Sequence, residues 1–254
     1  MQIPGSTALV TGANRGLGRE FVRALLDRGI GTVHAAARDD AAVRAAFPDD
    51  DRVVPLALDI TDEDAVAAAA QRCDDTSLVI NNAGAMMLSP FIGAPDLSAA
   101  RTEMETNYFG TLSMARAFAP VLAAHGGGAL VDVLSVVSWY ALPFNASYCA
   151  SKSAEWALTN ALRVELRGQG TLVVAVHPGF IDTDMTATVD APKISPRDVA
   201  AQTLDAVEHG REEVVTDESS RGVRDSLPHH LESLYPQVQQ QWDRGENPWG
   251  ASSS

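Results

Sequence analysis

The stretch "TGANRGLG" at residues 11–18 decides the fold expected for this chain. It follows a short apolar run over 6–12 and opens a pattern of apolar residues that predicts a helix over 16–28. Glycines at positions 12, 16 and 18 permit a tight turn and bring the backbone close to a phosphate at the positive end of that helix. A glycine-rich turn alone is a weak signal, but between a strand and a helix it predicts a nucleotide site.

The same alternation of short apolar runs and longer helical patterns continues along the chain. Strands are expected at 6–12, 31–38, 51–58, 76–82, 128–135, 171–179 and 212–217, and helices at 16–28, 40–46, 62–72, 97–124, 147–167 and 196–209. Most of the strands are continuously apolar, which is typical of a parallel sheet covered on both faces. The pattern predicts an α/β fold with a doubly wound parallel sheet of about seven strands and helices on both faces.

A single domain is expected for a chain of 254 residues. Residues 1–220 would form the dinucleotide-binding and catalytic domain, and residues 221–254 a C-terminal tail of the same domain. One helix is expected near 228–243. We expect the tail to cover an edge of the sheet rather than to form a separate unit.

Composition excludes some functions. The formal net charge of −14 argues against nucleic acid or an anionic membrane as a partner, because both need a basic face. Two cysteines are too few for a disulfide framework and indicate a reducing compartment. The N-terminus does not resemble a signal peptide, and no stretch is long and apolar enough to span a membrane, so a cytoplasmic protein is expected. The histidines have no metal-ligand spacing with Cys, Asp or Glu, which predicts that no metal is bound.

The end of the second expected strand bears on the choice of cofactor. An enzyme that selects NAD usually has an acidic residue there, which binds the ribose 2′-hydroxyl. Here Ala37 occupies that position and Arg38 follows it. A guanidinium can bind a 2′-phosphate through paired hydrogen bonds, and Arg15 could reach the same phosphate. NADP(H) is therefore expected rather than NAD(H), although Asp39 and Asp40 come directly afterwards and weaken the argument, and two solvated arginines are the alternative interpretation.

Tyr148 and Lys152 lie four residues apart at the start of a predicted helix, in "NASYCASK" (145–152). Positions i and i+4 share a helix face, so the lysine charge would sit beside the phenol and lower its pKa. By itself, this pair could equally be a surface pair without any function. Further motifs decide the matter: "DIT" (59–61), "NNAG" (81–84), Asn107 in "TNYFG", Ser135 and "PGFIDT" (178–183).

Together these motifs, in this order, resemble the short-chain dehydrogenase/reductase family in its common single-domain form, over residues 6–217. The resemblance implies a Rossmann fold and an oxidoreductase that transfers hydride between NADP(H) and a carbonyl or secondary alcohol. It implies that Tyr148 is the general acid and base, and that Lys152 holds the nicotinamide ribose and lowers the tyrosine pKa. Ser135 would hydrogen-bond the substrate oxygen, and Asn107 would complete a water-linked proton relay to Lys152.

The resemblance also implies a set of cofactor contacts. Asp59 and Ile60 would contact the adenine, and the carboxamide would be fixed by Ile181 and Thr183. For Asn81 a purely structural role, joining neighbouring strands, is an alternative. The full set expected to bind the cofactor is Thr11, Gly12, Asn14, Arg15, Gly16, Leu17, Gly18, Arg38, Asp59, Ile60, Asn81, Ala83, Gly84, Tyr148, Lys152, Pro178, Gly179, Ile181 and Thr183.

Substrate contacts are expected from three loops, at 85–91, 136–145 and 180–189. Their apolar and aromatic residues either line a pocket or pack in the core: Met86, Met87, Trp139, Tyr140, Leu142, Phe144 and Met185. A pocket of this kind predicts reduction of a hydrophobic ketone or aldehyde, that is, a carbonyl reductase. The family also implies a homodimer or homotetramer formed through helices 97–124 and 147–167.

Two other functions are open at this point. A sugar-nucleotide epimerase or dehydratase is disfavoured by the three residues between Gly12 and Gly16 and by the absence of a sizeable C-terminal substrate region. A catalytically silent NADP(H)-binding sensor or scaffold protein of the same fold is the alternative from another class. The presence of all four expected catalytic residues argues against it.

Overall fold

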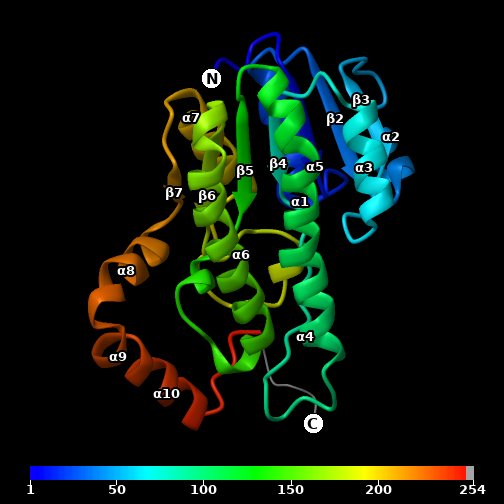
Figure 1. Ribbon diagram of the computed structural model, residues 1–254. Helices are drawn as coiled ribbons and strands as arrows, with labels where there is room; N and C mark the ends of the chain where they lie inside the picture. The colour runs from blue at the N-terminus through cyan, green and yellow to red at the C-terminus, as the bar shows by residue number, and fades with distance from the viewer. Residues whose placement is uncertain (250–254) are drawn as a thin grey trace.

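The structure is a computed structural model and describes residues 1–249. Seven parallel strands form one sheet in the order β3-β2-β1-β4-β5-β6-β7. Figure 1 shows this sheet among its helices. The strands are β1 (Thr7–Thr11), β2 (Thr32–Ala37), β3 (Val53–Ala57), β4 (Leu78–Asn81), β5 (Ala129–Val133), β6 (Leu172–His177) and β7 (Glu213–Val215). Each lies within the range expected from sequence, and the predicted doubly wound α/β fold is confirmed.

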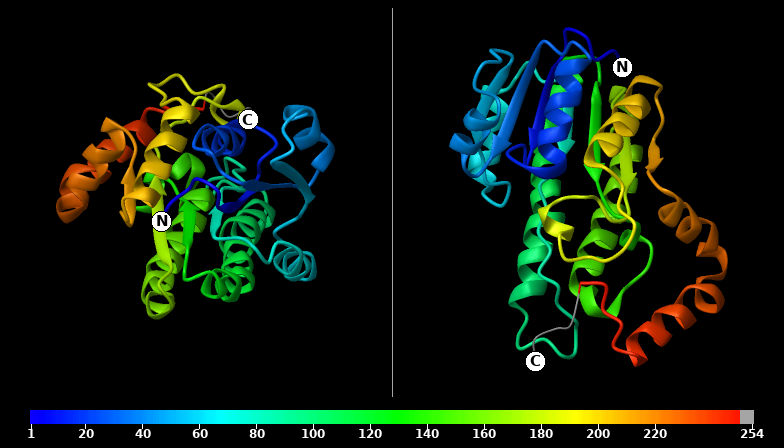
Figure 2. Two further views of the ribbon diagram at one scale, coloured as in Figure 1. Left: turned by 90° about the horizontal axis from the view of Figure 1, so that it is seen from above. Right: turned by 180° about the vertical axis from the view of Figure 1, so that it is seen from behind.

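Helices cover both faces of the sheet, and successive strand residues point to opposite layers. Ala8 and Val10 pack with α1, α2 and α7, whereas Leu9 between them packs with α3, α5 and α6. The two layers are visible in the view along the strands in Figure 2. These helices are α1 (Gly16–Asp27), α2 (Asp40–Ala46), α3 (Glu63–Arg72), α5 (Thr111–Ala124), α6 (Ala146–Glu165) and α7 (Pro196–Glu208). Both strand faces are buried, which explains the continuous apolar runs in the sequence.

The strand order places a crevice at the carboxyl ends of β1 and β4. The chain runs from β1 outward to β3, and then returns to the other side of β1 with β4. Crossovers of opposite direction leave a gap at such a point, where ligands of open α/β sheets bind. The glycine turn follows β1, and the "NNAG" motif follows β4, so both lie at this crevice.

The helix expected over 97–124 is one continuous rod made of three parts. These are α4 (Ser98–Glu103), a π-helical segment (Met104–Gly110) and α5. In Figure 1 the rod extends past the ends of the strands, beside the first turns of α6. A π-helical turn widens the helix and is frequently found at functional sites, and here it contains Asn107.

The tail forms three helices, α8 (Glu218–Ser226), α9 (His230–Ser233) and α10 (Tyr235–Asp243). The helix expected near 228–243 is present as α9 and α10, but α8 was not expected. The tail also lies differently from the expectation, since it leads away from β7 and returns to the start of α6 (Figures 1 and 2). Val238 is buried there against residues 136–149, and Val223, Tyr235 and Trp249 are partly buried in the same cluster. No helix within residues 1–249 has the length and apolar character needed to cross a membrane.

Candidate active site

The glycine turn after β1 is packed so closely that side chains could not replace two of its glycines. Gly12 adopts φ +66°, and a Cβ atom on it would lie 3.1 Å from the Cα atom of Ala83. A Cβ atom on Gly18 would lie 2.1 Å from the carbonyl oxygen of Gly12. Because α1 begins at Gly16, its first N–H groups open towards this turn. The turn is therefore a backbone cradle of the kind that fits a dinucleotide pyrophosphate.

Thr11 and Asn82 join the ends of β1 and β4. The Thr11 hydroxyl oxygen accepts hydrogen bonds from the backbone N–H groups of Asn82 and Ala83, at 2.9 and 3.0 Å. The Asn82 amide donates in return to the Thr11 carbonyl oxygen, at 2.9 Å. The side chain of Thr11, which was expected to bind the cofactor, thus holds the ends of β1 and β4 together at the crevice. Asn82 was not among the predicted site residues, although it belongs to the motif "NNAG".

Arg38 lies exposed directly after β2, and its charge contributes to lowering the pKa of Asp59. The larger cause is the hydrogen bond that Asp59 accepts from the backbone N–H of Thr61. The two acids that follow Arg38 have other partners. Asp39 caps α2 by accepting from the N–H of Ala41 at 3.0 Å, and Asp40 pairs with Arg44 at 2.9 Å. The objection that these acids would neutralise Arg38 is therefore weakened.

Other predicted cofactor residues lie along the same edge. Arg15 is exposed and forms a loose ion pair with Asp184, at 3.9 Å. Ile60 is buried against Gly110. A Cβ atom on Gly16 would lie 3.4 Å from the Thr183 side chain, so the first turn and the loop after β6 face each other.

Asn81 is buried and has the structural role that was considered for it. Its side-chain amide donates to the Asp132 carboxylate at 2.9 Å and so joins β4 to β5. Thr159 of α6 donates to the other oxygen of Asp132, also at 2.9 Å. Asp132 is fully buried, and burial raises its pKa despite these hydrogen bonds.

Tyr148 and Lys152 lie on consecutive turns of α6, as predicted. The Lys152 ammonium is 5.9 Å from the centre of the Tyr148 ring. The Lys152 side chain is buried and donates to the Val133 carbonyl oxygen at the end of β5, at 2.9 Å. Ser135 follows the same strand and begins a short 3-10 turn (Val136–Ser138), so the three side chains converge at the carboxyl ends of the strands.

The pKa of Tyr148 differs from the expectation. Burial raises the pKa of this phenol above its ordinary value, whereas the Lys152 charge and a hydrogen bond with Ser135 lower it. The predicted effect of lysine is present, but burial outweighs it. The sequence could not show this balance, because it does not reveal how far each group is removed from water.

Asn107 is held by three hydrogen bonds. Its amide donates to the Ala85 carbonyl and to the Ser151 hydroxyl, at 2.9 and 2.8 Å. Its side-chain oxygen accepts from the N–H of Ala85, at 2.8 Å. The side chain therefore ties the loop after β4 to α6, one residue from Lys152.

The motif after β6 is connected to the tail. The Gly179 N–H donates at 2.8 Å to Asp217, which also caps α8. Within the following loop, Ile194 donates to the carbonyl of Phe180 at 2.8 Å, so that the loop is closed on itself. Pro178 accepts from the N–H of Val136, also at 2.8 Å, which aligns this loop with the turn that begins at Ser135.

Aromatic and aliphatic side chains from the loops and the tail pack together in a cluster that includes Tyr148. Phe144 contacts Trp242, with ring centres 4.9 Å apart, and Phe180 contacts Trp249 edge-on at 5.6 Å. The hydroxyl of Tyr235 accepts from the N–H of Ala141 at 3.3 Å. The cluster consists of Val136, Val137, Trp139, Tyr140, Ala141, Leu142, Tyr148, Cys149, Val223, Tyr235, Val238 and Trp249. The tail residues were not predicted to join this cluster, because no local sequence pattern links them to the loops.

His177 is buried at the end of β6 and stacks on Trp139, with ring centres 3.9 Å apart. Its Nδ1 lies 3.2 Å from the Ser135 carbonyl oxygen. Burial lowers the pKa of His177 to about 3, so the ring is neutral in the physiological range.

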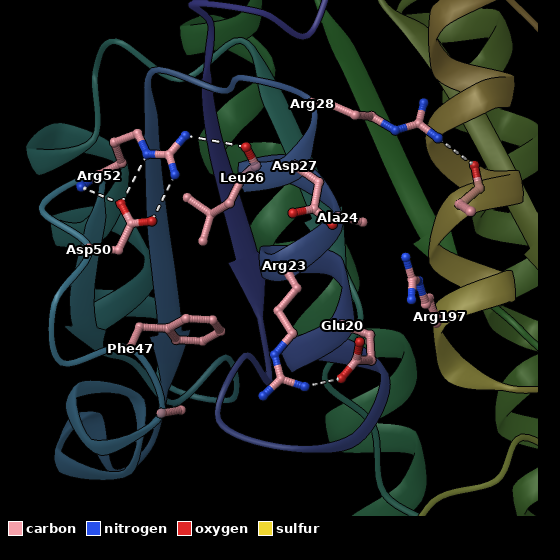
Figure 3. A pocket seen from close by; sticks show the side chains of 12 residues that line it. Glu20, Arg23, Ala24, Leu26, Asp27, Arg28, Phe47, Asp50, Arg52 and Arg197 are labelled. Atoms are coloured by element: carbon pink, nitrogen blue, oxygen red, sulfur yellow. Dashed lines mark hydrogen bonds and ion pairs between the residues drawn. The ribbon is translucent and has the colours of Figure 1, made fainter.

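A groove of about 620 Å³ lies elsewhere, between α1, α7 and the segment before β3 (Figure 3). Three of its arginines are already paired with carboxylates: Arg23 with Glu20, Arg28 with Asp205 and Glu208, and Arg52 with Asp50. None of the predicted site residues lines it. Across residues 1–249 no group of three or more His, Cys, Asp and Glu side chains is arranged to hold a metal.

Comparisons with known proteins find relatives of this chain among dehydrogenases and reductases. The family model for short chain dehydrogenases matches residues 6–193. The crystal structure of a short chain dehydrogenase from Burkholderia cenocepacia J2315, in complex with NADP, has 42% sequence identity and a TM-score of 0.88, covering 94% of this chain and 99% of that chain. D-erythrulose reductase of Gallus gallus is 35% identical over 71% of this chain and 73% of its own length.

A short chain dehydrogenase of Pseudocercospora fijiensis is 30% identical, and the match covers 75% of this chain. The chain spans 64% of the length of that relative. The family model covers most of the chain and includes the glycine turn, Asn107, Ser135, Tyr148 and Lys152. This chain belongs to the short-chain dehydrogenase family of oxidoreductases.

Proposed function

We propose that the protein is an NADP(H)-dependent carbonyl reductase that acts on hydrophobic ketones or aldehydes, and on the corresponding alcohols in reverse. The observation that carries this proposal is the convergence of Tyr148, Lys152 and Ser135 at the strand ends, beside the glycine cradle. The hydroxyls supply a proton and hydrogen bonds, and the cradle holds the hydride carrier.

Each residue has a distinct part in the proposed reaction. The Ser135 and Tyr148 hydroxyls orient the substrate carbonyl and stabilise the negative charge that develops on its oxygen. Tyr148 then gives its proton to that oxygen, or removes the proton from an alcohol. Lys152 holds the nicotinamide ribose and favours the phenolate with its charge, while Asn107 supports a water-linked relay that returns the proton. The cofactor supplies the hydride when bound.

The preference for NADP(H) rests on Arg38. Its guanidinium is exposed at the end of β2, and the adjacent acids Asp39 and Asp40 have other partners. The NADP complex of the Burkholderia cenocepacia relative supports the same cofactor. Arg15 would share the 2′-phosphate, and its ion pair with Asp184 at 3.9 Å is loose enough to exchange for it.

The apolar lining supports the class of substrate. Trp139 and Trp249 belong to the same apolar cluster as Tyr148, Phe180 contacts Trp249, and Phe144 contacts Trp242. Such a surface favours a ketone or aldehyde with an aliphatic or aromatic substituent over one with many hydroxyl groups. D-erythrulose, which names one relative, therefore makes a useful contrasting substrate.

We also infer a homodimer, in a cytoplasmic protein, that pairs through the outer faces of α4–α5 and α6. Phe109 and Val164 are 49% and 75% exposed on these helices, and burial in a partner interface would remove this apolar surface from water. Residues 1–220 form the catalytic domain in this proposal, and the tail completes its substrate side.

The proposal is tested by measuring NADPH consumption across aromatic ketones, aliphatic aldehydes and D-erythrulose, with NADH as a parallel cofactor. The expected result is turnover of the aromatic substrates with NADPH, at least ten times faster than with NADH. A preference for D-erythrulose would contradict the substrate class. Tight binding of NADPH without turnover of any carbonyl would contradict the enzymatic function and favour a sensor protein.

A further inference from the structure

A row of polar residues runs along the buried face of α6. Tyr148, Lys152, Glu155 and Thr159 are spaced by four, three and four residues, which puts them on one side of the helix. Glu155 is only 1% exposed, and Lys152 only 3%. Charged residues almost never occupy such positions unless they are paired. The face that carries Tyr148 is therefore built around a buried ion pair.

Glu155 contacts Lys152 directly. One carboxylate oxygen lies 2.6 Å from the Lys152 ammonium, and the other accepts from the Thr111 hydroxyl at 3.1 Å. The Val133 carbonyl accepts a second hydrogen bond from the ammonium, at 2.9 Å. A lysine ammonium has three N–H groups, so only one is left for a cofactor hydroxyl or the tyrosine. Glu155 thereby fixes the orientation of the Lys152 ammonium.

The carboxylate also changes the electrostatics of the site. Burial raises the pKa of Glu155 to about 7, although the Lys152 charge lowers it. For Tyr148, after the raising effect of burial, the Lys152 charge lowers the pKa and the Glu155 charge raises it again. A negative charge next to the ammonium therefore cancels part of the field that Lys152 exerts on the phenol.

We propose that Glu155 is a positioning residue of the reaction: its carboxylate fixes the Lys152 ammonium and offsets part of the lysine charge felt by Tyr148. The proposal rests on the proposed function, because it takes Tyr148 as the proton donor. It adds a third ionisable group to the Tyr148–Lys152 pair, one that changes charge near neutral pH.

The other ionisable groups around this pair are few. Asp132 on β5 acts on both Glu155 and Lys152, and Cys149 acts on Tyr148. Arg163, two turns after Glu155, acts on Asp132. Asp132 is bound to Asn81 and Thr159, whereas Glu155 alone of the two carboxylates contacts the ammonium. Glu155 is therefore the group whose removal changes the environment of Lys152 most.

The test is the variant Glu155→Gln, which keeps the shape and can still accept from Thr111. The ionisation of Tyr148 is followed by NMR of protein labelled at the tyrosine ring carbon bearing the hydroxyl. The Tyr148→Phe spectrum identifies its signal among the four tyrosines. We expect Tyr148 to ionise about one pH unit lower in Glu155→Gln. The pH profile of turnover should move in the same direction, and the two proteins should become alike near pH 6, where Glu155 is protonated.

Glu165→Gln is the matched control, since it makes the same change at the exposed end of the same helix. It should move neither measurement. If Glu155→Gln lowers the melting temperature but leaves the Tyr148 titration and the pH profile in place, Glu155 is only structural and the proposal is wrong. Should this variant not fold, Glu155→Asp keeps the charge but draws it back from the ammonium, and a smaller shift in the same direction is then required. The titration needs neither cofactor nor substrate, so its result stands apart from the proposed function.

Discussion

The turn around Gly12 and the cluster around Trp249 are built in different ways. The turn consists of backbone in close contact, between segments that end neighbouring strands. The cluster consists of side chains from residues 136–149, the Phe180 loop and the tail, which meet only in the folded chain. The first construction depends on the absence of side chains, the second on their size. We therefore expect substitutions in the two regions to affect different steps.

The largest effect is expected from Gly18→Ala. The added Cβ atom would lie 2.1 Å from the backbone oxygen of Gly12, so α1 has to move away from the turn. The variant should lose about 3 kcal/mol of stability and bind NADPH on the order of 100-fold more weakly. Melting temperature and NADPH fluorescence measure the two losses. Gly222→Ala is the control, because nothing lies within 4 Å of its Cβ position. Unchanged NADPH binding in Gly18→Ala would contradict the cradle.

Arg38→Ala should separate the two cofactors. Loss of a charge-assisted hydrogen bond costs about 1.5–3 kcal/mol, which corresponds to roughly 10- to 100-fold weaker NADPH binding. NADH affinity should stay within about twofold, since NADH has no 2′-phosphate for the guanidinium to bind. Titration with each cofactor measures this, and Arg72→Ala at the exposed end of α3 serves as the control. Equal losses of affinity for both cofactors would mean that Arg38 does not bind the 2′-phosphate.

Trp249→Ala should affect only the substrate side. Loss of its contact with Phe180 should lower kcat/KM for an aromatic ketone about tenfold, while the affinity for NADPH stays the same. Leu231→Ala, which changes an exposed tail residue, should have no effect. If Trp249→Ala instead weakens NADPH binding and leaves kcat/KM for the ketone unchanged, the proposal that the tail cluster contacts the substrate and not the cofactor is wrong.

The smallest effect is a difference in pH dependence at His177, which lies between the sheet and the tail. Its pKa is lowered to about 3 in the folded protein by burial, from an ordinary value of 6.5. Below pH 6.5, His177 therefore binds a proton in the unfolded chain but stays neutral in the folded chain. The free energy of unfolding falls as the pH drops below 6.5. Between pH 6 and pH 4 the wild type should lose up to about 1.4 kcal/mol per pH unit more than His177→Gln. Urea unfolding measures both slopes, and parallel slopes would show that His177 does not resist protonation.

The difference between the two regions also explains what the sequence could and could not predict. The strands and the glycine turn followed from apolar runs and from the motif after the first of them, because these are local patterns that parallel sheets impose. Tyr148, Lys152, Ser135 and the glycines were found for the same reason. Their places in motifs fix their places at the strand ends.

Long-range contacts were not predictable in the same way. Helix α8 was missed, since its few apolar residues give no clear period, and Val223 is partly buried only because the loop after β5 packs against it. Glu155 was not predicted as a site residue, although it is close to Lys152 in the sequence, because a glutamate on a helix is usually exposed. Its burial depends on Thr111 and β5, which the sequence does not place next to it. The raised pKa of Tyr148 was missed for the same reason, since burial is a property of the whole fold.

The central claim is that Tyr148 transfers the proton while other residues bind the cofactor. The most direct test titrates wild type and Tyr148→Phe with NADPH and then measures turnover of the best ketone on the same samples. We predict NADPH affinities within about threefold of each other and a loss of turnover of at least 100-fold, which is the usual contribution of a general acid. Turnover within tenfold of the wild type, with NADPH still bound, would contradict the account.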